Sequence, residues 1–443
     1  MMNRFFLFFF CSVISLQSFS QGKFSLQSGD MDKISFKLIS NLIVIPVEIN
    51  GVELSFLLDT GVSKPIIFNF LNVNEELQVN NAERIYLRGL GEGDTVEALK
   101  SKRNIFRIGD AINVNQDLYA IFDPALNFAP KLGVPIHGII GYDLLKDFVV
   151  EINYSNKYIK LHNPESYKPK KCKKCSSTYI SFYNNKPYVN AVVGIGNENS
   201  SVKLLVDTGG SDALWLFEDD AKDISIPNKY FYDFLGRGLS GSVYGKRSKV
   251  KRFVLANFEL LNANVAFPDS TSIAHAKKIK DRNGSLSGEI LKRFNIIFDY
   301  QNAKITLKKN SKFKNPFYYN KSGVTIEHSG VRVIKERDNI NLFNYRSSNN
   351  TTTAAKQVIL SDNYKFSLTP AFIVVELREN SPAKKAGLKI GDIILAVNNN
   401  AAHLFSLQDV IQMFYGENGK RIKLLVDRDG IQLKFQFKLE SLL

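Results

Sequence analysis

The chain of 443 residues contains an internal duplication, and each copy carries the same short motif. Asp59-Thr60-Gly61 ends the apolar segment ELSFLLDTG, and Asp207-Thr208-Gly209 ends SVKLLVDTG. A single such triplet occurs by chance in roughly one chain in ten of this length at average composition. Two copies in matching contexts indicate that each triplet ends an equivalent strand of a repeated fold.

A second stretch repeats downstream of each triplet. LKDFVVEINYSNKYIKL, residues 145–161, and LKRFNIIFDYQNAKITL, residues 291–307, align without a gap, and 7 of the 17 positions are identical. The two aspartates are 148 residues apart, and the two downstream stretches are 146 residues apart. These matching offsets predict a duplicated unit of about 130 residues that presents one aspartate from each copy.

Paired carboxylates from two related lobes suit the hydrolysis of an amide. Two carboxyl groups about 3 Å apart cannot both ionise, so they share a proton and their pKa values separate. The ionised group can take a proton from water while the protonated group polarises the carbonyl. Asp59 and Asp207 are therefore the candidate catalytic residues. Glycines for the tight turn and hydroxyls able to cross-link the loops are supplied by Thr60, Gly61, Thr208 and Gly209.

The motifs resemble those of the aspartic proteases, in a single-chain version of the retropepsin-like arrangement, over about residues 35 to 310. In that family an apolar-apolar-Gly triplet lies behind each catalytic loop. Ile139-Ile140-Gly141 matches it, whereas Leu286-Ser287-Gly288 departs from it at Ser287. The resemblance implies a mainly β, two-lobed aspartic-protease fold that works as a monomer with no metal or other cofactor.

The position after each triplet also departs from many pepsin-like enzymes, which have a Ser or Thr that supports the carboxylate there. This chain has Val62 and Gly210. With fewer hydrogen bonds to the ionised form, the dyad is expected to be less acidic than that of pepsin. Whether Ser63 and Ser211, one position further on, reach the carboxylates is left open by the sequence.

Glycine-rich stretches lie about thirty residues after each triplet. They resemble the flap hairpins that close over a bound peptide in the family. Either stretch alone is equally typical of an ordinary turn, but recurrence at the same place in both repeats favours flaps. The flap candidates are Gly89, Gly91, Gly93, Gly236, Gly238 and Gly241.

The N-terminal segment MMNRFFLFFFCSVISLQSFSQ has the pattern of a cleavable export signal: Arg4, an apolar stretch from Phe5 to Leu16, and small residues before Gln21. About a dozen apolar residues are too few to cross a membrane. Cys11 is preceded by a poor lipobox. We therefore expect a soluble protein in the periplasm or secreted, and not an integral membrane protein.

Two cysteines follow the signal, Cys172 and Cys175, in the Lys-rich segment KPKKCKKCSS. In an oxidising compartment we expect a local disulfide or a pair of idle thiols. A redox motif would need a strand-to-helix context, and a zinc site would need a second ligand pair that the 5 scattered histidines do not supply.

The net charge of +15 is spread over surface-type positions. A nucleic-acid groove would interleave such cations with stacking aromatics in a known module, and none is recognisable. We expect a solvated basic surface and no nucleic-acid partner, with attraction to anionic envelope surfaces as an open alternative.

Strand and turn patterns dominate both lobes, as in the hairpin signal Asn50-Gly51, with short helices expected near 142–146 and 288–293. After Asn310 a polar stretch begins, and SSNNTTTAAK is its most loop-like segment. The following FIVVELRENSPAKKAGLKIGDIILAVNNN resembles a PDZ domain (α+β). Ser381-Pro382-Ala383 is expected to open a short helix, and Gly391-Asp392 to turn into a strand.

The rest of the C-terminal module agrees with a PDZ domain. Ser406 and Asp409 form a capping-box-like helix start, and Asp429-Gly430 predicts a hairpin. No glycine-containing loop for a peptide carboxylate is evident in YKFSLTPAF, residues 364–372. Any peptide ligand is expected to bind by strand addition or in a helix-lined groove near Val410 and Phe414.

The expected organisation is a signal peptide at 1–20, lobe 1 at 35–163, a Lys/Cys linker at 164–178, lobe 2 at 179–310, a partly flexible connecting segment at 311–363 and the PDZ domain at 364–443. The favoured function is an exported aspartic endopeptidase whose PDZ module recruits protein or peptide substrates. The alternative is a non-catalytic envelope binding or scaffold protein. Two complete triplets favour the enzyme, because facing buried carboxylates cost stability unless they share a proton.

Overall fold

The computed structural model describes residues 22–68, 82–123, 126–196, 198–279, 281–337 and 364–443. The expected export signal and the segment SSNNTTTAAK lie outside these residues. The chain divides into two compact units, one comprising Met1–Ala129, Val134–Tyr319 and Leu442–Leu443, the other Pro130–Gly133 and Asn320–Ser441. Across the described part of the chain, no helix combines the length and the apolar character needed to span a membrane.

Lobe 1 is built around a hairpin that leads into the first Asp-Thr-Gly triplet. Strands β4 (Leu42–Ile49) and β5 (Val52–Leu58) pair antiparallel. Asn50 and Gly51 between them have φ angles of 51° and 89°, which is the left-handed turn that Asn-Gly predicts. Strand β10 (Gly138–Ile140) pairs parallel with β5 and so brings the apolar-apolar-Gly triplet beside the catalytic loop.

These strands belong to a sheet that has nine strands within the described residues. The other members are β1 (Ser25–Leu26), β3 (Lys37–Ile39), β6 (Ile66–Phe68), β7 (Glu83–Leu87), β8 (Val96–Ile108) and β9 (Ala111–Ile121).

Lobe 2 repeats the arrangement. Strands β15 (Lys186–Ile195) and β16 (Glu198–Asp207) form its hairpin, and β21 (Arg282–Ser287) pairs parallel with β16 beside the second triplet. The remaining strands of its sheet are β14 (Ser181–Tyr183), β17 (Leu214–Leu216), β18 (Phe231–Gly238), β19 (Gly241–Leu255) and β20 (Phe258–Pro268). The shared topology places Asp59 and Asp207 at equivalent points of the two lobes.

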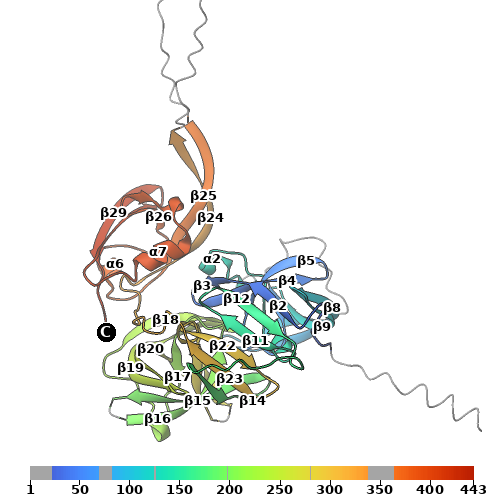
Figure 1. Cartoon of the computed structure of the whole chain (residues 1–443). Helices are drawn as coiled ribbons and strands as arrows, with labels where there is room; N and C mark the ends of the chain where they lie inside the picture. Colours follow the sequence, from blue (N-terminus) through green and yellow to red (C-terminus); the bar gives the residue numbers. More distant parts are fainter. Residues whose placement is uncertain (1–21, 69–81, 124–125, 197, 280, 338–363) are drawn as a thin grey trace, which may run out of the picture. The chain divides into compact units, whose positions relative to one another are not determined.

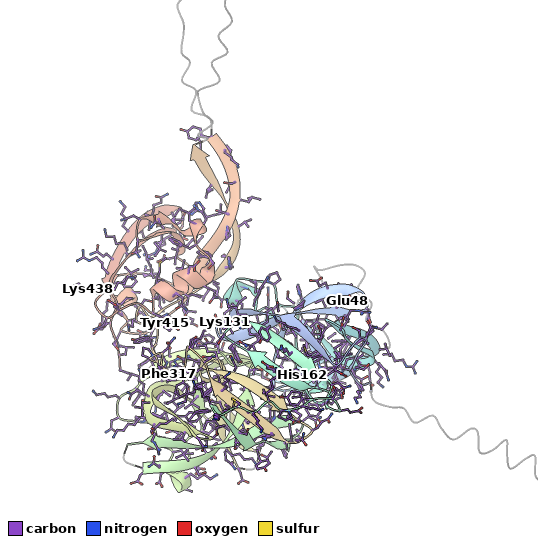
Figure 2. The ribbon with its side chains drawn as sticks, in the orientation of Figure 1. Glu48, Lys131, His162, Phe317, Tyr415 and Lys438 are labelled. Carbon is purple, nitrogen blue, oxygen red and sulfur yellow. A yellow bond between two sulfur atoms is a disulfide. The ribbon has the colours of Figure 1, made fainter. Side chains whose placement is uncertain are left out.

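The repeated stretches found in the sequence form the sheet between the lobes (Figure 1). β11 (Val149–Asn153) pairs antiparallel with β22 (Phe294–Asp299), with Val150 opposite Phe298. Their partners are β12 (Tyr158–His162), β23 (Lys304–Lys309), β2 (Met31–Ser35) and β13 (Cys175–Tyr179). Figure 2 labels His162 at the end of β12. Because the inner strands bury apolar residues from both copies, this sheet joins the two lobes through one core.

Short helices follow the apolar-apolar-Gly triplets, where the sequence predicts them. They are α3 (Tyr142–Leu145) and α5 (Gly288–Leu291). Cys172 and Cys175 form a local disulfide in the segment of the chain that connects lobe 1 to lobe 2. The other helical turns of this unit are α4 (Ala274–Lys277), η2 (Asp220–Lys222) and α2 (Ala129–Leu132), whose last residues cluster with the C-terminal unit.

The C-terminal unit has the sheet and helices that the PDZ resemblance implies. Ser381 caps α6 (Pro382–Lys385) by accepting from Lys384 N at 3.3 Å. Ser406 and Asp409 form a capping box on α7 (Leu407–Met413). The hairpin turn at Asp429 and Gly430 joins β28 (Arg421–Arg428) to β29 (Ile431–Lys438). The sheet also contains β25 (Tyr364–Leu377), β26 (Ile393–Val397) and β27 (Asn400–Ala401), with η3 (Ala402–Leu404) beside it.

The unit starts earlier than the sequence analysis places it. Strand β24 (Val324–Arg337) pairs with β25 along its length and, like β29, lies at an edge of the sheet in the described residues. The compact unit accordingly begins at Asn320 and not at residue 364. The polar segment therefore interrupts a hairpin of the PDZ unit and does not precede the domain.

Candidate active site

The two Asp-Thr-Gly loops are cross-linked by a symmetrical set of hydrogen bonds. Thr60 Oγ1 donates to Val206 O at 2.5 Å, and Thr208 Oγ1 donates to Leu58 O at 2.6 Å. Each hydroxyl also accepts from the backbone N–H of the other threonine at 3.0 Å. Both threonines are buried. The relative position of the loops is therefore fixed by bonds that need both threonines.

The carboxyl groups of Asp59 and Asp207 meet across this link and share a side-chain hydrogen bond. A Cβ added to Gly209 would lie 2.3 Å from Asp59 Cγ, and one added to Gly61 would lie 3.5 Å from Asp207 Oδ1. Each carboxyl thus lies over the other lobe's loop. Each also accepts a hydrogen bond from its own loop, Asp59 from Gly61 N at 2.6 Å and Asp207 from Gly209 N at 3.0 Å.

Burial and mutual repulsion keep one proton on this pair. Burial, together with the charge of Asp207, raises the pKa of Asp59 to about 7. Burial also raises the pKa of Asp207, but the charge of Arg282 and the backbone N–H groups of Gly209 and Gly210 oppose that rise. Because more groups stabilise the ionised form of Asp207, the arrangement favours the proton on Asp59.

Lys186 is a second cation beside the pair, and the sequence analysis did not single it out. Tyr188 is opposite Leu205 in the β15–β16 register, so continuing the register by two residues brings Lys186 opposite Asp207. Its charge acts on both carboxyl groups and lowers the pKa of each. In lobe 1, the same continuation from Val44 opposite Leu57 places Leu42 opposite Asp59.

Arg282 is the other cation that the sequence analysis missed. It is buried at the start of β21, where its Nε donates to Gly284 O at 3.2 Å and an Nη donates to Ser285 Oγ at 2.9 Å. The sequence signal that could have revealed it is a single charged residue at the start of the otherwise uncharged segment RNGSLS.

Gly210 and Ser287, the two positions of lobe 2 that depart from the family pattern, are neighbours in the structure. A Cβ added to Gly210 would lie 2.7 Å from Ser287 Oγ and 3.2 Å from Asp207 Oδ2. Glycine is therefore needed at 210 because Ser287 approaches the loop closely. Ser287, the polar residue of the lobe 2 triplet, therefore lies next to the catalytic loop, and Gly210 leaves room for it.

The two serines left open by the sequence contact the other lobe, Ser63 through its hydroxyl and Ser211 through its backbone oxygen. Ser63 Oγ donates to Asn184 O at 2.7 Å, so it does not support Asp59. Ser211 contributes its backbone O, which accepts from Asn41 Nδ2 at 2.7 Å. These contacts tie each catalytic loop to the turn that precedes the other lobe's first hairpin.

The flap candidates lie at two hairpin tips that touch each other. Ser240 N donates to Leu90 O at 2.9 Å, and Gly93 N donates to Ser240 O at 2.7 Å. A Cβ on Gly238 would lie 2.2 Å from Leu90 O, and one on Gly91 would lie 2.5 Å from Ser240 O. The glycines therefore allow the tips to interlock. Gly236 lies further back, at a bulge in β18.

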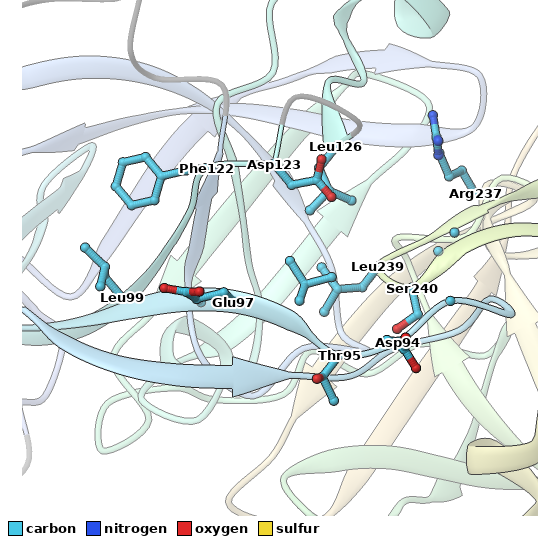
Figure 3. A pocket seen from close by; sticks show the side chains of 15 residues that line it. Asp94, Thr95, Glu97, Leu99, Phe122, Asp123, Leu126, Arg237, Leu239 and Ser240 are labelled. Atoms are coloured by element: carbon cyan, nitrogen blue, oxygen red, sulfur yellow. The ribbon is translucent and has the colours of Figure 1, made fainter.

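A cavity of about 610 Å³ opens beside these tips (Figure 3). Its wall combines apolar and charged side chains: Leu99, Phe122, Leu126, Asp94, Glu97, Asp123 and Arg237. The two carboxyl groups are not part of this wall, so the cavity is a side compartment next to the two hairpin tips. In the described residues, no group of three or more His, Cys, Asp or Glu side chains could hold a metal ion.

Val410 and Phe414 do not line a groove, because both are 0% exposed in the core of the C-terminal unit. Helix α7 contacts β24, so β24 is the strand that borders it. YKFSLTPAF forms part of β25. The turn that contains a glycine lies instead at residues 320–323, directly before β24. There Asn320 Oδ1 accepts from the N–H of Ser322 at 2.9 Å and of Gly323 at 3.1 Å.

Two family profiles match parts of the chain. Residues 45–144 match the profile of a family described as "Aspartyl protease", and residues 373–428 match that of the "PDZ domain". One matching solved structure is the aspartic proteinase from Irpex lacteus, with 12% identity, a TM-score of 0.40, and coverage of 64% of this chain and 99% of that chain. No curated protein matches the chain. The chain thus combines a duplicated aspartic-protease-like fold, whose first lobe matches the aspartyl protease family, with a C-terminal PDZ domain.

Proposed function

We propose that this protein is an aspartic endopeptidase that hydrolyses peptide bonds with a water activated by Asp59 and Asp207. The observation that carries the proposal is the pair itself: two partly buried carboxyl groups that share a hydrogen bond, on loops cross-linked by Thr60 and Thr208. A pair that holds one proton near neutral pH has both the base and the acid that amide hydrolysis needs.

The surroundings give the two aspartates different roles. Asp207, beside Lys186 and Arg282, is the ionised group and takes the proton from water. Asp59, with a pKa near 7, is the protonated group and donates to the carbonyl oxygen of the substrate. The two glycine-rich hairpin tips, which contact each other, act in this proposal as flaps that part to admit a chain. The cavity beside them, lined by both apolar and charged side chains, is large enough for a substrate side chain.

Export and substrate recruitment complete the proposal. The sequence of residues 1–20 has the pattern of an export signal, so the enzyme works in the periplasm or outside the cell. The PDZ domain supplies a peptide-binding module. The N–H groups of its glycine turn are already bonded to Asn320, so peptide capture by strand addition to β24, an outer strand of the sheet within the described residues, is the mode we propose.

Hydrolysis of an unfolded protein tests the activity. The wild type is expected to cleave it, the Asp207→Asn variant is not, and a pepstatin-like transition-state mimic should bind the former only. A folded wild type without activity on a broad peptide library would favour the non-catalytic scaffold.

Recruitment is tested separately by a chain that ends at Tyr319. This chain should retain activity on short peptides and lose efficiency on protein substrates, because only the latter engage the PDZ unit. Equal activity of both chains on protein substrates would contradict recruitment and leave the proposed hydrolysis unaffected.

A further inference from the structure

The outer half of the β24–β25 hairpin is a two-stranded ribbon. Residues 331–337 pair with residues 364–370, whereas β26 pairs with β25 only at Phe372 and Ile373. Figure 1 shows this ribbon extending beyond the other strands of the C-terminal unit. Two strands without a third neighbour or a covering helix are marginally stable in water. A ribbon of this kind is stabilised when one of its faces is covered.

One face of the ribbon is apolar and exposed. Alternate residues of a strand share a face, and residues opposite each other in the register share it too. Val331 and Val333 therefore lie on the same face as Phe366 and Leu368. Their exposed fractions are 64%, 61%, 65% and 69%. Tyr364, on the same face, is 44% exposed. Contiguous exposed apolar side chains of this kind mark a surface that binds something.

The charge of the ribbon identifies the kind of surface that it fits. Lys335 lies on the apolar face, with its Nζ 3.7 Å from the centroid of the Tyr364 ring. Arg332 and Lys365 lie on the opposite face. Besides these three cations, the ribbon contains Arg337, opposite Tyr364, and a single acidic residue, Glu336, opposite Lys365, so its net charge is positive. An occupant that is both apolar and anionic would complement this pattern.

We propose that this face of the ribbon docks on the surface of an anionic lipid bilayer. Val331, Val333, Phe366 and Leu368 would enter the boundary of the acyl chains, with the Tyr364 hydroxyl and the Lys335 ammonium at the level of the headgroups. The two cations of the opposite face lie within about a Debye length of the lipid phosphates, roughly 10 Å, and add attraction. A protein partner would need pockets for its anchoring side chains, whereas a bilayer requires none. This docking is independent of the proposed hydrolysis.

Co-sedimentation with vesicles tests the proposal. The full chain is mixed with vesicles of phosphatidylglycerol and phosphatidylcholine, or of phosphatidylcholine alone. We expect binding to the anionic vesicles, and a loss of about tenfold or more in the Phe366→Ser, Leu368→Ser double variant, because two large apolar side chains no longer enter the bilayer. The matched control on the opposite face, Ser367→Ala with Thr369→Ala, should bind like the wild type.

Two further comparisons make the result decisive. Lys335→Gln should weaken binding to anionic vesicles and leave binding to neutral ones unchanged. The same variants are compared in chains that start at Gln21, so that binding by the apolar N-terminal segment is separated from binding by the ribbon. Melting curves establish that every variant is folded.

Three outcomes would overturn the proposal. The first is a wild type that starts at Gln21 and does not bind the anionic vesicles. The second is equal binding by the serine double variant. The third is a self-associating wild type whose association, measured without vesicles, is lost in the double variant while vesicle binding is unchanged, which would assign the face to a second copy of the chain.

Discussion

The two lobes hold the same loop in the same position but surround it differently. In lobe 1, Asp59 faces a leucine across the β-hairpin and has an apolar-apolar-Gly triplet behind its loop. In lobe 2, Asp207 faces Lys186, has Ser287 behind its loop, and is influenced by the buried Arg282. Duplication thus supplies the geometry of the pair, and divergence of the neighbours decides which carboxyl is ionised.

The pair itself should show the largest effect. We expect Asp59→Asn and Asp207→Asn each to lower kcat/KM by on the order of a thousandfold or more, because either change removes the shared proton arrangement. The double variant should be no worse than the worse single variant. Steady-state kinetics on a fluorogenic peptide measure all three, and multiplicative losses would show that the two lobes act separately.

The pH dependence of the free energy of unfolding should also reveal the proton that Asp59 and Asp207 share. The pKa of Asp59 is about 7 in the folded chain, against an ordinary value of 3.8. Between those values the unfolded chain has released a proton that the folded chain retains, so stability falls as pH rises through this window, by at most about 1.4 kcal/mol per pH unit. Below the window the contribution is fully present.

The Asp59→Asn variant lacks this proton and should lose this slope. Its melting temperature is expected to exceed that of the wild type at about pH 8, above the folded pKa, and to approach it below about pH 4, near the unfolded pKa. Differential scanning calorimetry over this range provides the measurement. A difference in melting temperature that does not change with pH would show that Asp59 is not protonated in the folded chain at neutral pH.

Local features of the fold could be predicted from the sequence, and features that depend on register could not. The Asn50-Gly51 turn, the capping box at Ser406 and the interlobe strands are encoded by residues close together in the chain or by an ungapped repeat. Strand β24 was missed because residues 338–363 separate it from its partner.

The cations beside the dyad were missed for a related reason. The first hairpins of the two lobes differ in length, 8 and 7 residues for β4 and β5 against 10 and 10 for β15 and β16. Counting back from the aspartates therefore does not align Lys186 with Leu42. Only the pairing register shows that these residues are equivalent.

The loops should also differ in their tolerance of a methyl group. Gly210→Ala would place a Cβ 2.7 Å from Ser287 Oγ and 2.9 Å from Ser287 Cβ, so the neighbouring strand must move. We expect a loss of about 1–3 kcal/mol in the free energy of unfolding. Adding Ser287→Gly should restore part of it, because the atoms that clash are removed. Urea denaturation measures both, and an unaffected single variant would contradict the close approach.

The smallest effect expected is electrostatic and concerns Lys186. Lys186→Met removes a cation that lowers the pKa of both carboxyl groups, so the pH dependence of kcat/KM should move to higher pH. For a shift of about one unit, activity on the acidic side falls by about tenfold. Leu42→Met, at the equivalent position of lobe 1, is the matched control and should leave the profile in place because it changes no charge. If the Lys186→Met profile coincided with that of the wild type while Leu42→Met also had no effect, the asymmetry between the lobes would lie in Arg282 and the loop amides alone.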